Sequence, residues 1–190
     1  MSKRAGAILF ASGLILSACS PQAPPPTVNA SMTQVMAPHA QTVWDITSRA
    51  FNARGDALDA SKISDSDWAQ MEKAGEQIKE RAVILAKARR IVATAPGETI
   101  MGETAASPAD KKSGDWDAAS GKQVQAMIDA NPALFVQRAQ ILANAGETIR
   151  KASRTKDARK LYEVSSNLDE VCDGCHQKFW GTDEPPPFPK

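Results

Sequence analysis

Three residues near the end of the chain, Cys172, Cys175 and His176, have the types and the spacing that attach a haem of the c type. In the pattern Cys-x-x-Cys-His, each thiol adds to one vinyl group of the porphyrin, and the adjacent histidine gives the iron its proximal nitrogen ligand. On a helix the three side chains share one face, because residues three and four apart lie side by side. The sequence therefore predicts one covalently bound haem c, held by Cys172 and Cys175, with His176 as an iron ligand.

Two other uses of a Cys-x-x-Cys pair fit this chain less well. A thioredoxin-like redox pair belongs to a βαβ unit, and no strand pattern lies near Cys172. A structural zinc ion needs four ligands, whereas the chain holds only one further cysteine, Cys19, and one further histidine, His39, both far from the motif. The acidic residues form no constellation for acid–base catalysis, so we expect no enzymatic activity.

The start of the chain has the order of a bacterial export signal. Two basic residues precede an apolar stretch over 5–16, which is too short to span a bilayer as a helix. Leu-Ser-Ala-Cys at 16–19 resembles a lipobox, so we expect removal of residues 1–18 and acylation of Cys19. Acyl groups there would anchor the protein to the lipid bilayer on the periplasmic side of a membrane, and Ser20 favours the outer membrane. The alternative is an ordinary signal peptide that leaves a free thiol.

The overall composition favours a helical protein without nucleic-acid partners. Lysine and arginine number 23 against 22 aspartates and glutamates, so the chain lacks the basic excess that nucleic-acid binding requires. Good helix formers are plentiful and β-branched runs are few, which predicts an all-α fold. Proline-rich segments flank the helical part: residues 19–30 read as a tether and 185–190 as a tail.

Four helical patterns fill residues 31–184, with a shorter helix over 116–130 in an insertion at about 96–131. The first pattern contains Pro38, at which we expect a kink or a helix restart. Asp65 or Ser66 can cap the second pattern, and Asn131-Pro132 begins the third. In the fourth pattern the two haem cysteines fall on the apolar face, so we expect the haem inside the bundle with one edge exposed. The four patterns run over 31–54, 66–95, 132–153 and 155–179.

This order of elements resembles the cytochrome c-prime superfamily over about residues 31–180. The specific part is the Cys-x-x-Cys-His motif on the last helix, followed by an aromatic residue at Phe179. The resemblance implies an antiparallel four-helix bundle with the haem attached to its last helix, and a possible homodimer. The first-helix pattern of Met32, Pro38 and Val43-Trp44 also resembles an exported subgroup of these cytochromes. The insertion before the third helix and the lipidated, proline-rich start depart from the soluble members.

The sixth iron ligand is the main open question. In that superfamily the second axial position lies near the first helix, and Met32 matches the methionine of low-spin members best. Met36 and His39 lie on the same face, and an open position is the remaining alternative. A thioether ligand raises the reduction potential, which suits an electron carrier, whereas methionine also serves simply to fill gaps in a core.

Two functional hypotheses follow from the sequence. The first is a membrane-anchored monohaem electron carrier that cycles between Fe(II) and Fe(III) and meets unidentified redox partner proteins. The alternative is a five-coordinate, c-prime-like haem protein that binds nitric oxide or carbon monoxide. A haem-bearing subunit of a larger oxidoreductase is a third possibility. Lys178 and Arg54 are candidate partners of the haem propionates.

Overall fold

The structure is a computed structural model that describes residues 26–100 and 119–180. The expected signal at 1–18, residues 19–25 of the expected tether with Cys19, and the tail at 185–190 lie outside the described residues, as does the start of the helix expected over 116–130. Within the described ranges the fold is all-α, as predicted. An isolated β-bridge between Phe51 and Leu58 is the one extended pairing in that part of the chain.

The first helical segment changes its pitch just before Pro38. It consists of α1 (Val28–Ser31), a π-helical turn η1 (Met32–Met36) and α2 (Ala37–Ala50). Proline has no N–H, and its ring clashes with the carbonyl four residues earlier, so a wider turn accommodates it. The Ala37 N–H donates to the Met32 carbonyl, five residues back. The irregularity predicted at Pro38 is this π turn, and the helix ends at Ala50 and not near 54.

The N-cap of the next helix lies one or two residues earlier than the two predicted positions. A turn and a short 3-10 helix, η2 (Ala60–Lys62), lead into α3 (Asp65–Lys87). The Ser64 hydroxyl accepts from the Asp67 N–H at 3.1 Å, and the Asp67 carboxylate accepts from the Ser64 N–H at 3.1 Å. This reciprocal capping box satisfies backbone donors that have no partner inside the helix. Ser64 is therefore the cap, in place of the predicted Asp65 or Ser66.

The end of α3 was predicted wrongly, because the helix stops at Lys87 and not near 95. The residues that follow pair with the start of the described chain. The N–H groups of Val28 and Asn29 donate to the carbonyls of Val92 and Ala93 at 2.8 and 2.9 Å. These contacts, between segments more than 60 residues apart, override the local helix propensity of the segment after Lys87.

The second half of the chain adds four helices: α4 (Gly121–Ala130), α5 (Pro132–Arg154), α6 (Ala158–Ser166) and α7 (Leu168–Phe179). The start of α5 at Pro132 agrees with the prediction. The single helix predicted over 155–179 is instead two helices that meet at Asn167, where φ and ψ are −97° and −1°. The Asn167 amide donates to the Glu163 carbonyl at 2.9 Å. An asparagine side chain that bonds to the backbone in this way competes with helix continuation.

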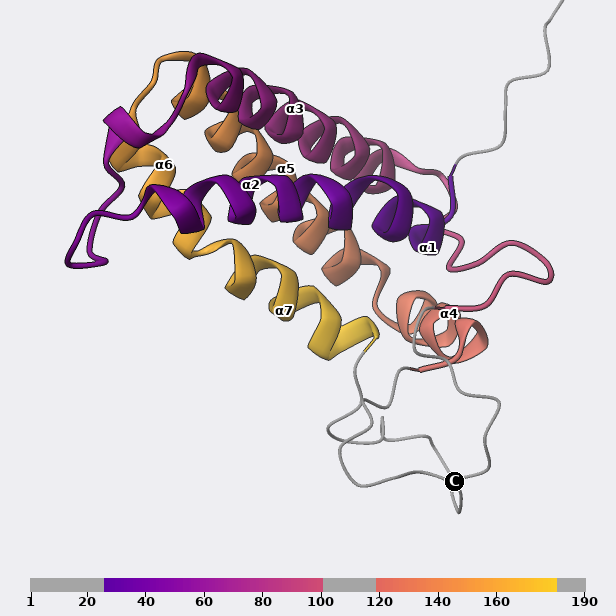
Figure 1. Ribbon diagram of the computed structural model, residues 1–190. Coiled ribbons are helices and arrows are strands. Elements are labelled where there is room, and N and C mark those ends of the chain that lie inside the picture. Colours follow the sequence, from indigo (N-terminus) through magenta and orange to yellow (C-terminus); the bar gives the residue numbers. More distant parts are fainter. Residues whose placement is uncertain (1–25, 101–118, 181–190) are drawn as a thin grey trace, which may run out of the picture.

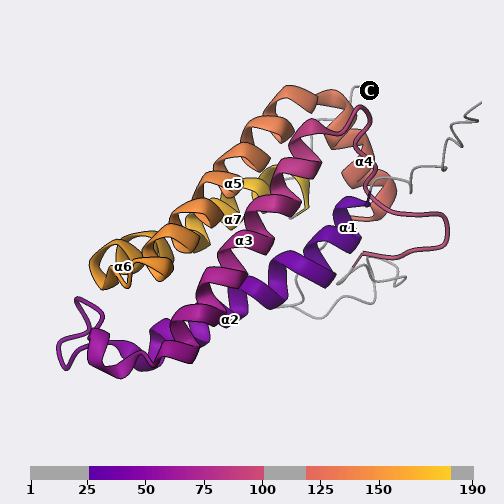
Figure 2. The ribbon, with the colours of Figure 1, turned by 90° about the horizontal axis from the view of Figure 1, so that it is seen from above.

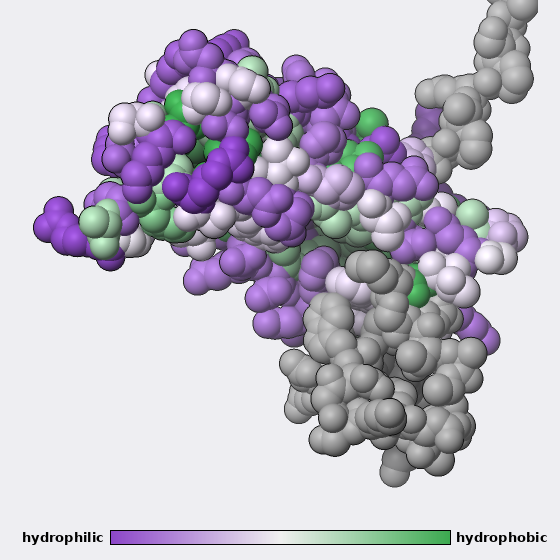
Figure 3. All heavy atoms as spheres, viewed as in Figure 1, coloured by the Kyte–Doolittle hydropathy of each residue, from purple (hydrophilic) through white to green (hydrophobic). Residues whose placement is uncertain are grey.

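The long helices lie side by side around an apolar interior (Figures 1 and 2). α3 and α5 make the most extensive contact, α2 packs on α3, and α6 and α7 pack on α5. Most of the outer face in Figure 3 is hydrophilic. The predicted apolar register holds across the break between α6 and α7, since Leu161, Leu168 and Phe179 are all buried. The bulkiest fully buried side chains include Val43, Met71, Ile78, Ile128, Phe135, Ile149, Leu161 and Leu168.

Candidate functional site

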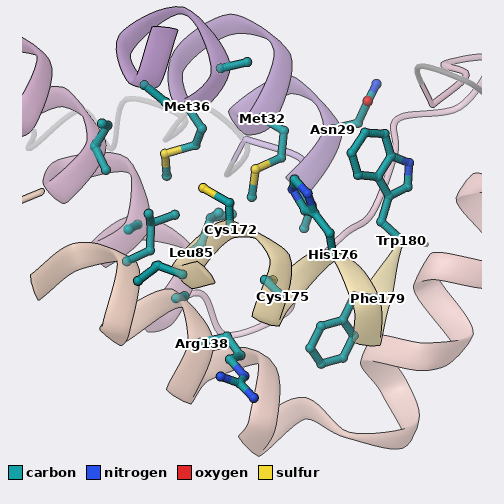
Figure 4. Close-up of a pocket in the computed structure, with 18 of the residues that line it drawn as sticks. Asn29, Met32, Met36, Leu85, Arg138, Cys172, Cys175, His176, Phe179 and Trp180 are labelled. Carbon is teal, nitrogen blue, oxygen red and sulfur yellow. The ribbon is translucent and has the colours of Figure 1, made fainter. Parts of the chain in front are cut away.

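An apolar cavity of about 290 Å³ lies between the first helical segment and α7. Cys172, Cys175 and His176 line it from α7, and Met32 and Met36 line it from the facing segment (Figure 4). Its volume is roughly twice the ~150 Å³ of an engineered cavity that binds benzene. It also approaches the lower limit of ordinary small-molecule sites. The structure thus brings the three predicted haem-binding residues together on the wall of one cavity.

The ends of α7 determine which way the motif faces. Leu168 and Phe179 are buried at the two ends of the helix. The Phe179 ring packs edge to face on Phe135 of α5, with centroids 5.4 Å apart and planes at 74°. Burial of Leu168 and Phe179 fixes the orientation of α7 about its own axis and so determines which face of the helix is turned inward. Cys172 lies four residues after Leu168 and Cys175 four residues before Phe179, so both share the face of these two residues and point into the cavity.

Both thiols are neutral at physiological pH. Burial raises the pKa of Cys172 to about 11, and the charges of Asp169 and Asp173 act in the same direction. Burial also raises the pKa of Cys175 to about 11, against the opposing charge of Arg138. Thiol–disulfide enzymes instead lower the pKa of the attacking cysteine. The site therefore does not favour the thioredoxin-like interpretation, and the described residues contain no strand for a βαβ unit.

The electrostatics at His176 favour a metal-binding imidazole. Burial lowers the pKa of His176, although the nearby Asp173 carboxylate opposes that shift. A neutral ring keeps a nitrogen lone pair available for coordination. The described residues contain no group of three or more His, Cys, Asp or Glu side chains that could hold a metal ion by themselves.

The candidates for the sixth ligand differ in whether they line the cavity. Met32 and Met36 both line the cavity, and Figure 4 shows their side chains directed toward α7. His39 is not part of the cavity wall. Its pKa is lowered by burial and by the charge of Lys73 on α3, which indicates that the ring lies nearer to that helix. Of the three candidates, the two methionines therefore line the cavity and the histidine does not.

Two side chains with buried N–H donors lie on the wall, and neither of them was assigned a role toward the haem from the sequence. Arg138 of α5 and Trp44 of α2 both line the cavity. Arg138 Nε and Trp44 Nε1 are buried without a hydrogen-bond acceptor in the described part of the chain. Arg138 lies beside the inward-facing Ala139, so a cation next to the apolar stripe of α5 was the available signal. Neither Arg54, which pairs with Asp56 at 3.6 Å, nor the exposed Lys178 is on this wall.

These unpartnered donors provide a test of whether haem fits the cavity. A buried donor without an acceptor costs about 1–3 kcal/mol, so the wall suits a group that brings its own acceptors. A porphyrin carries two carboxylates on an otherwise apolar ring. Its ring matches the aliphatic and aromatic walls, and its carboxylates supply acceptors that the protein does not. The residues present therefore fit a haem.

Comparison of the chain with protein-family models, with curated proteins and with solved structures found no match. Among the described helices, none combines the length and the apolar character needed to cross a bilayer. The functional argument therefore rests on the motif and on the cavity around it.

Proposed function

We propose that the protein is a monohaem c-type cytochrome that carries electrons on the periplasmic side of a bacterial membrane, tethered through a lipid on Cys19. In this proposal the helices form an antiparallel four-helix bundle with the haem attached to its last helix. The observation that carries the proposal is the placement of Cys172, Cys175 and His176 on one wall of an apolar cavity, with Met32 on the facing wall. When bound, the haem supplies one-electron Fe(II)/Fe(III) chemistry.

The residues of the chain have distinct roles in this proposal. Cys172 and Cys175 hold the porphyrin through thioether bonds, and His176 provides the proximal nitrogen. Phe135 and Leu85, which are 2% and 3% exposed, keep water away from the site. Exclusion of water favours the ferrous state, because that state carries less net charge, and so raises the reduction potential.

The packing of the two methionines favours Met32 over Met36 as the sixth ligand. Met36 is 6% exposed and belongs to a buried cluster with Ile78, Ala82 and Ala143, so its burial is explained by packing alone. Met32 is only partly buried and touches the edges of two clusters. It also begins the π turn, and such turns occur frequently at functional sites. Packing alone explains the position of Met36 but not that of Met32, which favours Met32 as the iron ligand.

The experiment is to export the full chain from a bacterium that matures c-type cytochromes. Mass spectrometry of the peptide with residues 172–176 should show one added haem. A Cys172→Ala, Cys175→Ala double variant should lose it. An unmodified peptide from the wild-type protein would contradict the proposal at its base.

Absorption spectra of both redox states then test the ligand. We expect a low-spin wild type and a high-spin Met32→Ala variant, while Met36→Ala, the matched control, stays low-spin. A five-coordinate wild type whose ferrous form binds carbon monoxide would instead support the gas-binding alternative. That result would remove the electron-carrier assignment but keep the haem site.

A further inference from the structure

An aromatic ring lies against His176. Trp180, the residue that follows the last residue of α7, contacts the imidazole edge to face, with centroids 4.7 Å apart and planes at 81°. The two residues are four apart, so their side chains lie on the same side of the helix. Trp180 also lines the cavity, and Figure 4 shows its indole next to the imidazole.

The backbone of Trp180 is fixed from both directions. Its N–H donates to the His176 carbonyl at 2.8 Å, and its own carbonyl accepts from the Ala119 N–H at 2.9 Å. Ala119 is 3% exposed and precedes α4. The preceding Phe179 is buried against Phe135. The backbone of Trp180 is therefore tied to both α7 and the segment before α4, and this placement holds the base of the indole next to the imidazole.

We propose that Trp180 is a positioning residue, which holds the His176 imidazole in one orientation and excludes water from it, and thereby raises the reduction potential of the iron. This inference rests on the proposed function, because it takes His176 as the proximal ligand. The edge-to-face contact restricts rotation of the imidazole. The bulk of the indole removes water from the ligand's environment, and a drier environment favours ferrous over ferric iron.

The expected size of the effect follows from the energy of one aromatic contact. That energy limits the change in the Fe(III)/Fe(II) ratio at a fixed potential to about two- to tenfold. We therefore expect Trp180→Ala to keep its covalent haem and to shift this ratio toward Fe(III) by an amount in that range. The electron paramagnetic resonance lines of the ferric form should also broaden, because several imidazole orientations become populated.

Four exported, full-length proteins make the test: wild type, Trp180→Ala, Trp180→Phe and Trp44→Ala. Haem content, spectroelectrochemical titration and electron paramagnetic resonance are measured on each. Trp180→Phe keeps an aromatic ring and should restore narrow lines and most of the wild-type potential. Trp44→Ala removes an indole that lines the same cavity from α2, on the wall facing α7, so it should broaden the lines less than Trp180→Ala.

Each outcome separates this inference from the proposed function. A haem-loaded Trp180→Ala protein with wild-type potential and line shape overturns the inference and leaves the cytochrome intact. Wild type without haem overturns both. If Trp180→Ala yields no loaded protein, Trp180→Leu is compared with Trp180→Phe. A shifted leucine variant beside a wild-type-like phenylalanine variant supports the role of the ring, and equal behaviour of the two overturns it.

Discussion

Replacement of Gly146 by alanine tests how close the contact is between α3 and α5. The added methyl group would lie 2.7 Å from the Lys79 N and 2.8 Å from the Gly75 O, and both are backbone atoms. Ordinary van der Waals contact begins near 3.4 Å, so the helices must separate by roughly 0.7 Å. The same two helices contribute Ala82 and Ala139 to the cavity wall, so the change reaches the site.

Two effects of the substitution oppose each other. Alanine stabilises a helix interior by about 1 kcal/mol relative to glycine. Overpacking of a close-packed contact costs about 1–3 kcal/mol. We expect the upper value at Gly146, because backbone atoms move only if a whole helix moves. The net loss is then about 2 kcal/mol, which in a domain of this size lowers the Tm by about 4–8 °C.

Thermal and urea unfolding followed by circular dichroism measure this loss. Gly174→Ala is the matched control, because Gly174 is also helical but its added methyl group would meet the end of the flexible Arg138 side chain at 3.1 Å. Its helix-propensity gain should survive, with an unchanged or slightly raised Tm. A Gly146→Ala protein as stable as wild type would refute the reasoning, since it would show that α3 and α5 separate at almost no cost.

Three further predictions concern local features of the fold. A hydrogen bond from Arg150 holds the pKa of Glu147 well below its ordinary value of 4.5. This stabilisation is complete above about pH 4.5 and is lost as the pH falls through the lower folded-state value, so Glu147→Gln should be less stable at pH 7 and show a flatter acid decline in urea titrations. Ser64→Ala should cost about 1 kcal/mol by removing the cap that binds the Asp67 N–H, and Ser64→Thr should recover most of it in the same assay. Phe179→Ala should cost about 3–5 kcal/mol and Phe179→Leu clearly less, as read from urea midpoints.

The start of α5 was predicted from neighbouring residues, whereas the cap of α3 at Ser64, which is also local, was placed one or two residues too late. Pro132 begins α5 as expected, because proline after asparagine is a local start signal. The end of α3 could not be read locally, since it depends on hydrogen bonds from Val28 and Asn29, which are remote in the chain. The break at Asn167 had a local signal, an asparagine inside a helical pattern, but the apolar register continues through it and conceals the interruption.

The candidate site also combines features that local sequence predicts with features that depend on contacts between remote segments. Cys172, Cys175 and His176 are nearly contiguous, so their common face follows from helix geometry alone. Arg138 reaches the cavity only through the packing of α5 against α7, and no spacing rule connects it to the motif. Trp180 did carry a readable signal, because an aromatic residue four positions after a histidine lies over it on a helix.

The choice of small side chains around the motif supports the view that the cavity belongs to a bound group. The wall facing α7 includes the buried alanines Ala40, Ala82 and Ala139, which lie among larger apolar side chains such as Ile78, Leu85 and Phe135. An enclosed apolar cavity costs about 24 cal/mol per Å³, so a cavity of 290 Å³ without a filling group would cost at most on the order of 7 kcal/mol, and less where it opens to solvent. That is comparable with the whole stability of a typical domain. Leucines at these positions would fill the space and remove the cost, so the alanines beside two inward-facing cysteines support the proposed haem, whose ring would take up that space.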